Sequence, residues 1–150
     1  MIPFCRTTEE CRLVLKTMKE FGLERGYNNL EVYLMCEVPS NVIEADNFSK
    51  YIDGVSIGGN DLLQLTLGLD RDSDKLITLS DYHNTSYLRM ISRAIDIYKK
   101  KGIKVGFCGQ QPSDDLKFAK FLLKEGIDSI SITPDSLLNI YNNLTIPSLL

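Results

Sequence analysis

The 150-residue sequence predicts an α/β protein with a parallel sheet, and three observations carry this prediction. Short apolar runs alternate with longer segments whose apolar residues recur at helical spacing. Glycine or proline stands at most of the joins between them. At the clearest join, an apolar strand meets Gly58-Gly59, and the polar pair Asn60-Asp61 precedes a leucine-rich helix. Alternating strand and helix segments indicate a parallel sheet covered by helices.

The predicted elements follow one another as strand and helix along the whole chain. In order they are a strand tail at 1–4, a helix from 8 to about 22, a strand at 31–38, a helix at 40–51, a strand ending at 57, a helix from 60, a helix at 85–101, a strand at 103–108, a helix at 112–125, a strand at 127–132 and a helix at 134–142. The polar and acidic stretch 68–84 is expected to be a long surface loop.

The helices are predicted from apolar stripes together with start and stop signals. Glu9 and Glu10 suit the positive end of the first helix, behind a threonine that can cap it. The apolar face of this helix is expected to consist of Val14, Leu15, Met18 and Phe21. The helix at 85–101 has the same pattern and ends in three lysines and a glycine, as helix C-termini often do.

Composition and length restrict the class of protein. We assign residues 1–150 to a single domain with a loose tail at 143–150. The 43% hydrophobic and 25% charged residues are ordinary for a globular chain, and a net charge of −3 argues against a nucleic-acid surface. No apolar run approaches the roughly 20 residues of a membrane span. Without a signal peptide or zinc-like cysteine spacing, the four cysteines are expected to be reduced thiols of a cytoplasmic protein.

Polar side chains stand at the carboxyl ends of three predicted strands. Glu37 ends one strand, Asn60 and Asp61 follow the next, and Cys108 ends a third. Because parallel strands end at one rim, Glu37, Asp61 and Cys108 can converge there. Two carboxylates, with water and substrate oxygens, suit Mg²⁺. A thiol beside that centre could serve as an acid or a base.

A purely structural interpretation of the same residues is also open. Glu37 could brace a loop, Asp61 could cap a helix, and Cys108 could be a small buried hydrophobic residue. His83, the single histidine, is expected to be a solvated loop residue, since no nucleophile pattern surrounds it. The sequence contains neither a dinucleotide fingerprint nor a phosphate-binding P-loop.

Four stretches of the sequence resemble a known family. They are MCEVPSN at 35–41, SIGGNDLLQLTLGLDRDS at 56–73, VGFCGQ at 105–110 and GIDSIS at 126–131. Together they closely resemble the C-terminal barrel of the phosphoenolpyruvate synthases (pyruvate, water dikinases). Pyruvate phosphate dikinases and enzyme I of the sugar phosphotransferase system share a looser version. The resemblance runs from Met1 to about Asn142.

This resemblance implies the C-terminal half of a TIM (β/α)₈ barrel that binds pyruvate or phosphoenolpyruvate. The complete enzyme converts ATP, pyruvate and water to AMP, phosphoenolpyruvate and phosphate. Glu37 and Asp61 match the Mg²⁺ ligands, which also contact substrate, and Cys108 matches the residue that exchanges a proton with the substrate's methyl or methylene carbon. The substrate-binding loop matches Gly58, Gly59, Asn60 and Asp61.

The sequence also departs from the family pattern. Gly59 and Leu63 stand where relatives often have Ser and Thr. Gly59 is expected to make the substrate loop more flexible and removes a hydroxyl. Leu63 is expected to point towards the packed side of its helix. A complete barrel takes about 250 residues. The family's substrate-binding arginines and its phosphohistidine motif are absent, so His83 is not given that role. We therefore expect the ATP-binding and phosphohistidine domains on further sequence or another chain, and pairing of the half-barrel with itself or with its other half.

Three functions remain open on the sequence. The first is the Mg²⁺-dependent substrate-binding part of a phosphoenolpyruvate synthase, which the joint presence of Glu37, Asn60, Asp61 and Cys108 favours. The second is a non-catalytic half-barrel acting as a relic, a regulatory module or an assembly module, which the absent arginines favour. The third is an open flavodoxin-like binding domain, whose strand order would differ from that of a barrel.

Overall fold

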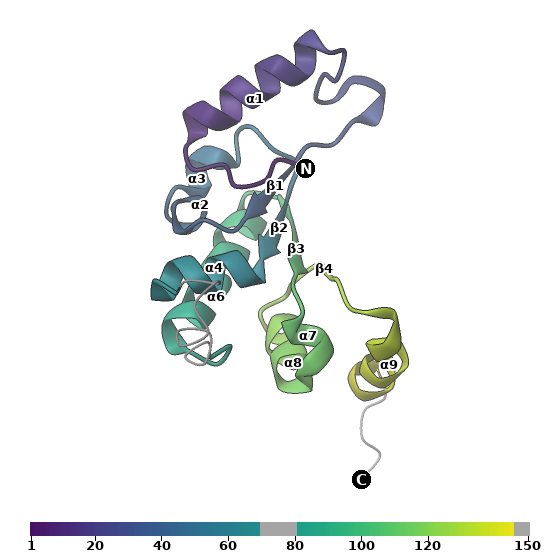
Figure 1. Cartoon of the computed structure of the whole chain (residues 1–150). Helices are drawn as coiled ribbons and strands as arrows, with labels where there is room; N and C mark the ends of the chain where they lie inside the picture. The colour runs from purple at the N-terminus through teal and green to yellow at the C-terminus, as the bar shows by residue number, and fades with distance from the viewer. Residues whose placement is uncertain (70–80, 146–150) are drawn as a thin grey trace.

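The computed structural model describes residues 1–69 and 81–145. In these ranges, a fully parallel sheet of four strands runs in the order β1-β2-β3-β4. The strands are β1 (Tyr33–Cys36), β2 (Gly54–Gly58), β3 (Lys104–Cys108) and β4 (Ser129–Ile130). Ile2 forms an isolated parallel bridge with Leu34, so the strand tail predicted at 1–4 is reduced to one residue. The predicted α/β class with a parallel sheet is confirmed (Figure 1).

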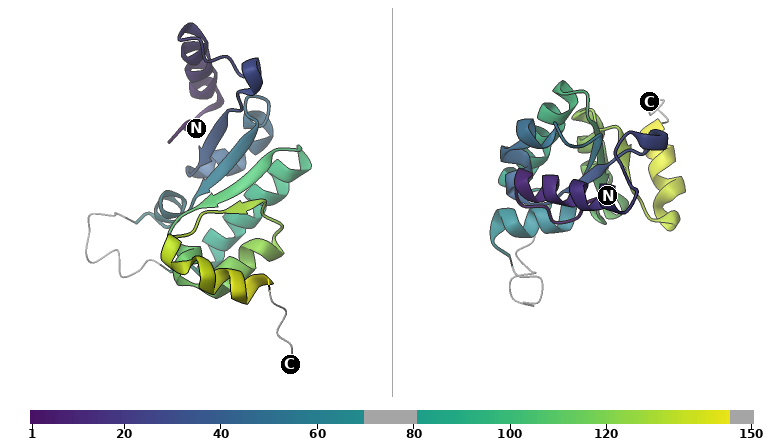
Figure 2. Two further views of the ribbon diagram at one scale, coloured as in Figure 1. Left: turned by 90° about the vertical axis from the view of Figure 1, so that its right-hand side faces the viewer. Right: turned by 90° about the horizontal axis from the view of Figure 1, so that it is seen from above.

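Helices connect and flank the strands. They are α1 (Thr8–Glu20), α2 (Pro39–Ile43), α3 (Ala45–Phe48), α4 (Gly59–Leu67), α6 (Thr85–Lys100), α7 (Gln111–Asp114), α8 (Leu116–Lys124) and α9 (Leu137–Thr145), with short 3-10 turns at Tyr27–Asn29 and Pro134–Ser136. Helices α1 and α9 lie at opposite ends of the molecule (Figures 1 and 2). Over the described ranges, none of these helices combines the length and apolar character that crossing a membrane requires.

Two predicted helices are each divided in the structure. The helix predicted at 112–125 becomes α7 and α8, because Asp115 adopts an extended backbone and its side chain accepts the N–H groups of Lys117 and Phe118. An aspartate bonded in this way starts a helix rather than continuing one. The helix predicted at 40–51 likewise becomes α2 and α3, separated at Glu44, whose φ of −98° and ψ of 22° are not helical.

Other element boundaries also differ from the prediction. The strands expected at 31–38 and 127–132 shorten to β1 and β4, because only their central residues join the ladder. The tail expected at 143–150 is wrong at its start, since residues 143–145 belong to α9. Residues 146–150, and most of the loop expected at 68–84, lie outside the described residues.

Alternation along the strands separates a buried face of the sheet from a more open one. The buried face packs against α6 and α8, and its strand residues are Leu34, Cys36, Val55, Ile57, Val105 and Phe107, each at most 1% exposed. The side chains of the other face are half-buried or exposed; this open face consists of Tyr33, Met35, Ser56, Lys104, Cys108 and Ser129. The left view of Figure 2 shows the strands in front of α6. Helices therefore cover one face of the sheet more completely than the other.

Helix α1 buries less of its apolar face than its sequence predicts. Leu15 and Met18 pack partly against the core, and Cys11 is the one residue of the helix that is fully buried. Val14 is 37% exposed and Phe21, directly after the helix, is 81% exposed. The predicted apolar face is therefore only half covered within the described part of the chain.

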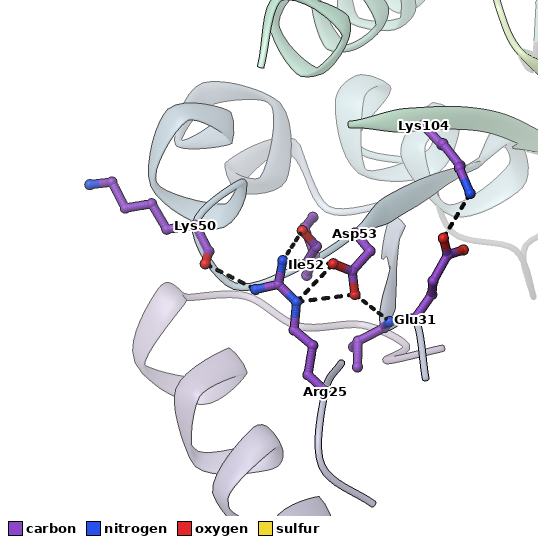
Figure 3. Close-up of polar contacts among 7 residues, drawn as sticks. Arg25, Glu31, Lys50, Ile52, Asp53 and Lys104 are labelled. Atoms are coloured by element: carbon purple, nitrogen blue, oxygen red, sulfur yellow. Dashed lines mark hydrogen bonds and ion pairs between the residues drawn. The ribbon is translucent and has the colours of Figure 1, made fainter. Parts of the chain in front are cut away.

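The loop after α1 is joined to the start of β2 by one arginine (Figure 3). The Arg25 guanidinium donates to both carboxylate oxygens of Asp53 and to the carbonyl oxygens of Lys50 and Ile52, at 3.1 and 2.8 Å. Asp53 also accepts the N–H of Val32 at 2.8 Å. Burial opposes ionisation of Asp53, but the bonds from Arg25 and Val32 outweigh it and hold the pKa of this carboxyl below its ordinary value.

We expect Asp53→Ala to lower the free energy of unfolding by about 1–3 kcal/mol, because the N–H of Val32, a residue 1% exposed, loses its acceptor. The matched control is Lys104→Ala, which removes the exposed Lys104–Glu31 pair and should cost at most about 1 kcal/mol. Urea denaturation of the three proteins measures both effects. Equal losses in the two variants would contradict this account of Asp53.

Candidate functional site

The candidate site lies where β1, β2 and β3 end. Gly58 stands directly opposite Cys108 in the ladder, and Glu37 follows Cys36, which pairs with Ile57. Glu37 therefore stands beside Gly58. A Cβ on Gly58 would lie only 2.6 Å from Glu37 Oε2, so the side chain of Glu37 leans over Gly58, towards the strand that carries Cys108. Glu37 and Cys108 thus flank Gly58 at one rim of the sheet.

Glu37 is held from both its backbone and its side chain. Its Oε1 accepts the N–H of Phe4 at 2.7 Å, and its own N–H donates to the Oδ1 of Asn41 at 3.2 Å. The residue is only 5% exposed. Burial raises the pKa of the Glu37 carboxyl, the Phe4 bond lowers it and the charge of Asp61 raises it, with a net increase. Glu37 thus braces the N-terminal segment, and it also brings a buried carboxyl to the rim.

Asp61 lies in the first turn of α4 and is half-buried. No side chain caps this helix, which begins directly after Gly58, so the interpretation of Asp61 as a helix cap is wrong. Over residues 1–69 and 81–145, neither Glu37 nor Asp61 has a cationic partner. Two neighbouring carboxylates without a counter-charge fit a divalent cation.

A metal at this rim would have to draw its other ligands from elsewhere. No group of three or more His, Cys, Asp or Glu residues in the described ranges could hold a metal ion. Mg²⁺ usually takes one or two carboxylates and completes its six oxygens with water and substrate. The donor set of Glu37 and Asp61 therefore fits Mg²⁺ better than it fits a metal that needs a complete protein cage.

Cys108 differs from the other three cysteines of the chain. It is exposed at the end of β3, whereas Cys5, Cys11 and Cys36 are buried, and all four are free thiols. Burial raises the pKa of Cys11 and of Cys36 to about 12, so these two stay protonated at neutral pH. The interpretation of Cys108 as a buried hydrophobic residue is wrong, and its thiol is open to a ligand at the rim.

The junction of β2 with α4 is tightly packed. A Cβ on Gly59 would lie 2.5 Å from the Phe107 ring and 2.8 Å from Gln111 Oε1, and the Gly59 carbonyl accepts the hydroxyl of Tyr87 at 3.0 Å. Gly59 is therefore closely packed, and a side chain at this position would require Phe107 and Gln111 to shift. Leu63 is 3% exposed in the core, as expected.

Sequence reasoning missed three residues that support the rim. They are Asn41, Tyr87 and Gln111, which hold Glu37, Gly59 and Asn60 respectively. Tyr87 and Gln111 act from elements distant from their partners, so no local pattern marks them, and Asn41 ends the MCEVPSN stretch but was given no role. His83 lies in an exposed turn, as predicted, and its Nε2 also lies 2.6 Å from the Oδ2 of Asp115.

The geometry can be compared with known proteins. A family model described as "PEP-utilising enzyme, PEP-binding domain" matches residues 1–146. The chain belongs to this family. Its relatives include the phosphoenolpyruvate synthases of Synechocystis sp., Aquifex aeolicus and Escherichia coli, which are 57%, 56% and 46% identical over 138, 138 and 144 residues. These alignments take in 92%, 92% and 96% of this chain but only 17%, 16% and 18% of the relatives, so the chain spans about one sixth of their length.

Solved structures share the fold of this PEP-utilising family member. A HpcH/HpaI aldolase/citrate lyase family protein from Burkholderia cenocepacia aligns with a TM-score of 0.61 and 16% identity, over 95% of this chain and 61% of its own. A pyruvate kinase from Cryptosporidium parvum aligns with a TM-score of 0.62 and 13% identity, over 91% of this chain and 28% of its own. At such identities the likeness concerns the fold alone, and both neighbours are TIM-barrel-like.

We expect Glu37→Gln to raise the melting temperature at neutral pH by about 2–4 °C, or about 1 kcal/mol, because it removes a buried charge and keeps an acceptor for Phe4. The raised pKa means that the folded state prefers protonated Glu37. The stability of the wild type relative to the variant should therefore be greatest below about pH 4 and fall as the pH rises through the folded pKa.

Thermal unfolding between pH 4 and 8 without divalent cations measures this difference. Glu20→Gln, a change at an exposed helix position, serves as the control and should move the stability by no more than about 0.5 kcal/mol. A Glu37→Gln variant that is less stable than the wild type at pH 7 would show that the ionised carboxyl supports the fold.

Proposed function

We propose that this chain is the Mg²⁺-dependent pyruvate- and phosphoenolpyruvate-binding part of a phosphoenolpyruvate synthase. The observation that carries the proposal is the placement of Glu37 and Cys108 on either side of Gly58, with Asp61 close enough to affect the ionisation of Glu37. A small planar acid above Gly58 would meet carboxylates from one direction and a thiol from the other. Membership of the PEP-utilising family supports this choice of ligand.

The proposed chemistry assigns a separate task to each side chain. Pyruvate must lose a methyl proton before its oxygen can accept a phosphoryl group. The Cys108 thiolate takes that proton, and in the reverse direction the thiol returns it to the methylene carbon. Mg²⁺ held by Glu37 and Asp61 would supply positive charge to the enolate oxygen when bound. Asn60, exposed in the first turn of α4, offers a hydrogen bond to an anionic oxygen of the substrate.

The complete reaction needs groups beyond those at this rim. The phosphoryl group comes from ATP through a phosphohistidine, and we place both the ATP-binding and the phosphohistidine domains on further sequence or on another chain. Relatives about six times as long as this chain support that assignment. The whole activity is that of a pyruvate, water dikinase. This chain's part in it is to bind the acceptor, pyruvate, and to remove the proton from its methyl carbon. We propose that the protein is cytoplasmic, a reducing setting that suits four free thiols.

The central measurement is calorimetric titration with oxalate, a planar mimic of enolpyruvate. Oxalate should bind in the presence of Mg²⁺, and Asp61→Ala should weaken binding about 10- to 100-fold because one of two protein carboxylates is lost. Asp96→Ala, which removes an exposed carboxylate paired with Lys100, should leave the affinity unchanged.

Two outcomes of this titration would contradict the proposal. Binding that needs no Mg²⁺ or survives Asp61→Ala would move the ligand away from the rim carboxylates. Absence of binding in the wild type would favour the alternative, a non-catalytic module that serves regulation or assembly.

We also propose that this chain is the C-terminal half of a (β/α)₈ barrel whose open face is closed by further strands. On the open face, Tyr33, Met35 and Ser56 are only partly covered. In the described structure no strand pairs with the outer side of β4, and only Ile2 pairs with the outer side of β1. The barrel-like aldolase neighbour, of which this chain covers 61%, supports the assignment.

When the 150 residues are produced alone, we expect the open face to drive association with a second copy. Light scattering coupled to size-exclusion chromatography should then give a mass that rises with protein concentration. A monodisperse monomer with a cooperative melting transition at all concentrations would rule out pairing through this face.

A further inference from the structure

Gln111 is a buried amide that contacts the candidate substrate loop from another element. It is the first residue of α7 and is 0% exposed. Its Nε2 donates to the Oδ1 of Asn60 at 2.8 Å, across 51 positions of sequence. Its Oε1 is buried without a hydrogen-bond partner within the described structure. A buried amide with one end unpaired is uncommon, which indicates a role other than stabilising the core.

Two glycines make room for this amide. A Cβ on Gly59 would lie 2.8 Å from Gln111 Oε1, and a Cβ on Gly109 would meet the same oxygen still more closely. The Phe107 ring lies 3.1 Å from the same Cβ position on Gly109. The amide of Gln111 is thus enclosed by the start of α4 and by the segment that follows β3, and its freedom to rotate is small.

The bond from Gln111 determines which end of the Asn60 amide is free. Because the Oδ1 of Asn60 accepts from Gln111, its NH₂ group is the end left for a ligand, and this group donates no other hydrogen bond in residues 1–69 and 81–145. An NH₂ group is a donor and suits an anionic oxygen. The opposite orientation would present an oxygen and repel the same ligand.

We propose that Gln111 is a positioning residue, which orients Asn60 so that the substrate loop donates a hydrogen bond to an anionic carboxylate or enolate oxygen. The inference rests on the proposed function for the identity of the ligand. The orientation of Asn60 itself does not depend on that function. Gln111 thus extends the site from the three strand ends to the first turn of α7.

The test compares Gln111→Glu, Gln111→Met and the control Gln110→Glu, which makes the same chemical change at the exposed neighbour. At pH 7 the carboxylate of Gln111→Glu can only accept, so the Asn60 amide should turn its NH₂ group towards position 111. Gln111→Met removes the hydrogen bond without adding charge and serves as the second variant if the buried carboxylate impairs folding. Two readouts are used: side-chain amide NMR signals of Asn60 without ligand, and oxalate affinity with Mg²⁺.

We expect both Gln111 variants to shift the Asn60 amide signals, and Gln110→Glu to leave them unchanged. Oxalate affinity should fall about tenfold in Gln111→Glu, about 1.4 kcal/mol, and less in Gln111→Met. In the Asn60→Ala background the Gln111 changes should have no further effect on affinity. If Gln111 had a structural role alone, its substitution would lower stability equally with Asn60 and with Asn60→Ala, and its effect on oxalate affinity would not depend on Asn60.

The outcomes separate this inference from the proposed function. Unchanged Asn60 signals in Gln111→Met, or a full loss of affinity that persists in Asn60→Ala, would overturn the positioning role. Shifted Asn60 signals in a protein that binds no oxalate would support the orientation of Asn60 by Gln111 and contradict the proposed substrate.

Discussion

The buried amide of Asn41 holds together the part of the structure on which the site depends. Its Oδ1 accepts the N–H groups of Glu37 and Val38, its Nδ2 donates to the Cys5 carbonyl, and its own carbonyl accepts the hydroxyl of Tyr98. One fully buried side chain therefore connects β1, the N-terminal segment and, through its backbone, α6. Because each of its polar atoms is paired, its burial is compatible with a stable fold.

The bonds around Asn41 hold the carboxyl group of Glu37 in a position where its negative charge is unfavourable. Glu37 is buried beside Asp61 without a cation in the described structure, and only the Phe4 N–H offsets the cost on its side chain. Phe4 reaches it with a φ of 47°, a conformation that non-glycine residues rarely adopt. Strained backbone and a buried carboxyl together are typical of sites that bind a ligand rather than of positions that only support a fold.

Sequence reasoning succeeded where it depended on local patterns. Alternation of strand and helix predicted the parallel sheet, and the rule that parallel strands end at one rim predicted that Glu37 and Cys108 share that rim. It failed at Asp115 and Glu44, where one expected helix becomes two, because side-chain capping and local backbone geometry outweigh an apolar stripe. It also did not predict the close packing around Gly59, because nothing in the local sequence shows that Phe107 and Gln111 fill the space beside it.

The fold class, the family and the residue types at the rim can be predicted from the sequence, since they follow from periodicity and from motifs that are contiguous along the chain. Which of those residues are accessible, and which distant residues orient them, depends on the packing of the folded chain. Cys108 is exposed while three other cysteines are buried, and Gln111 rather than a sequence neighbour bonds Asn60. Burial and side-chain hydrogen bonds across more than 30 residues are set by strand register and helix packing, which local sequence patterns do not encode.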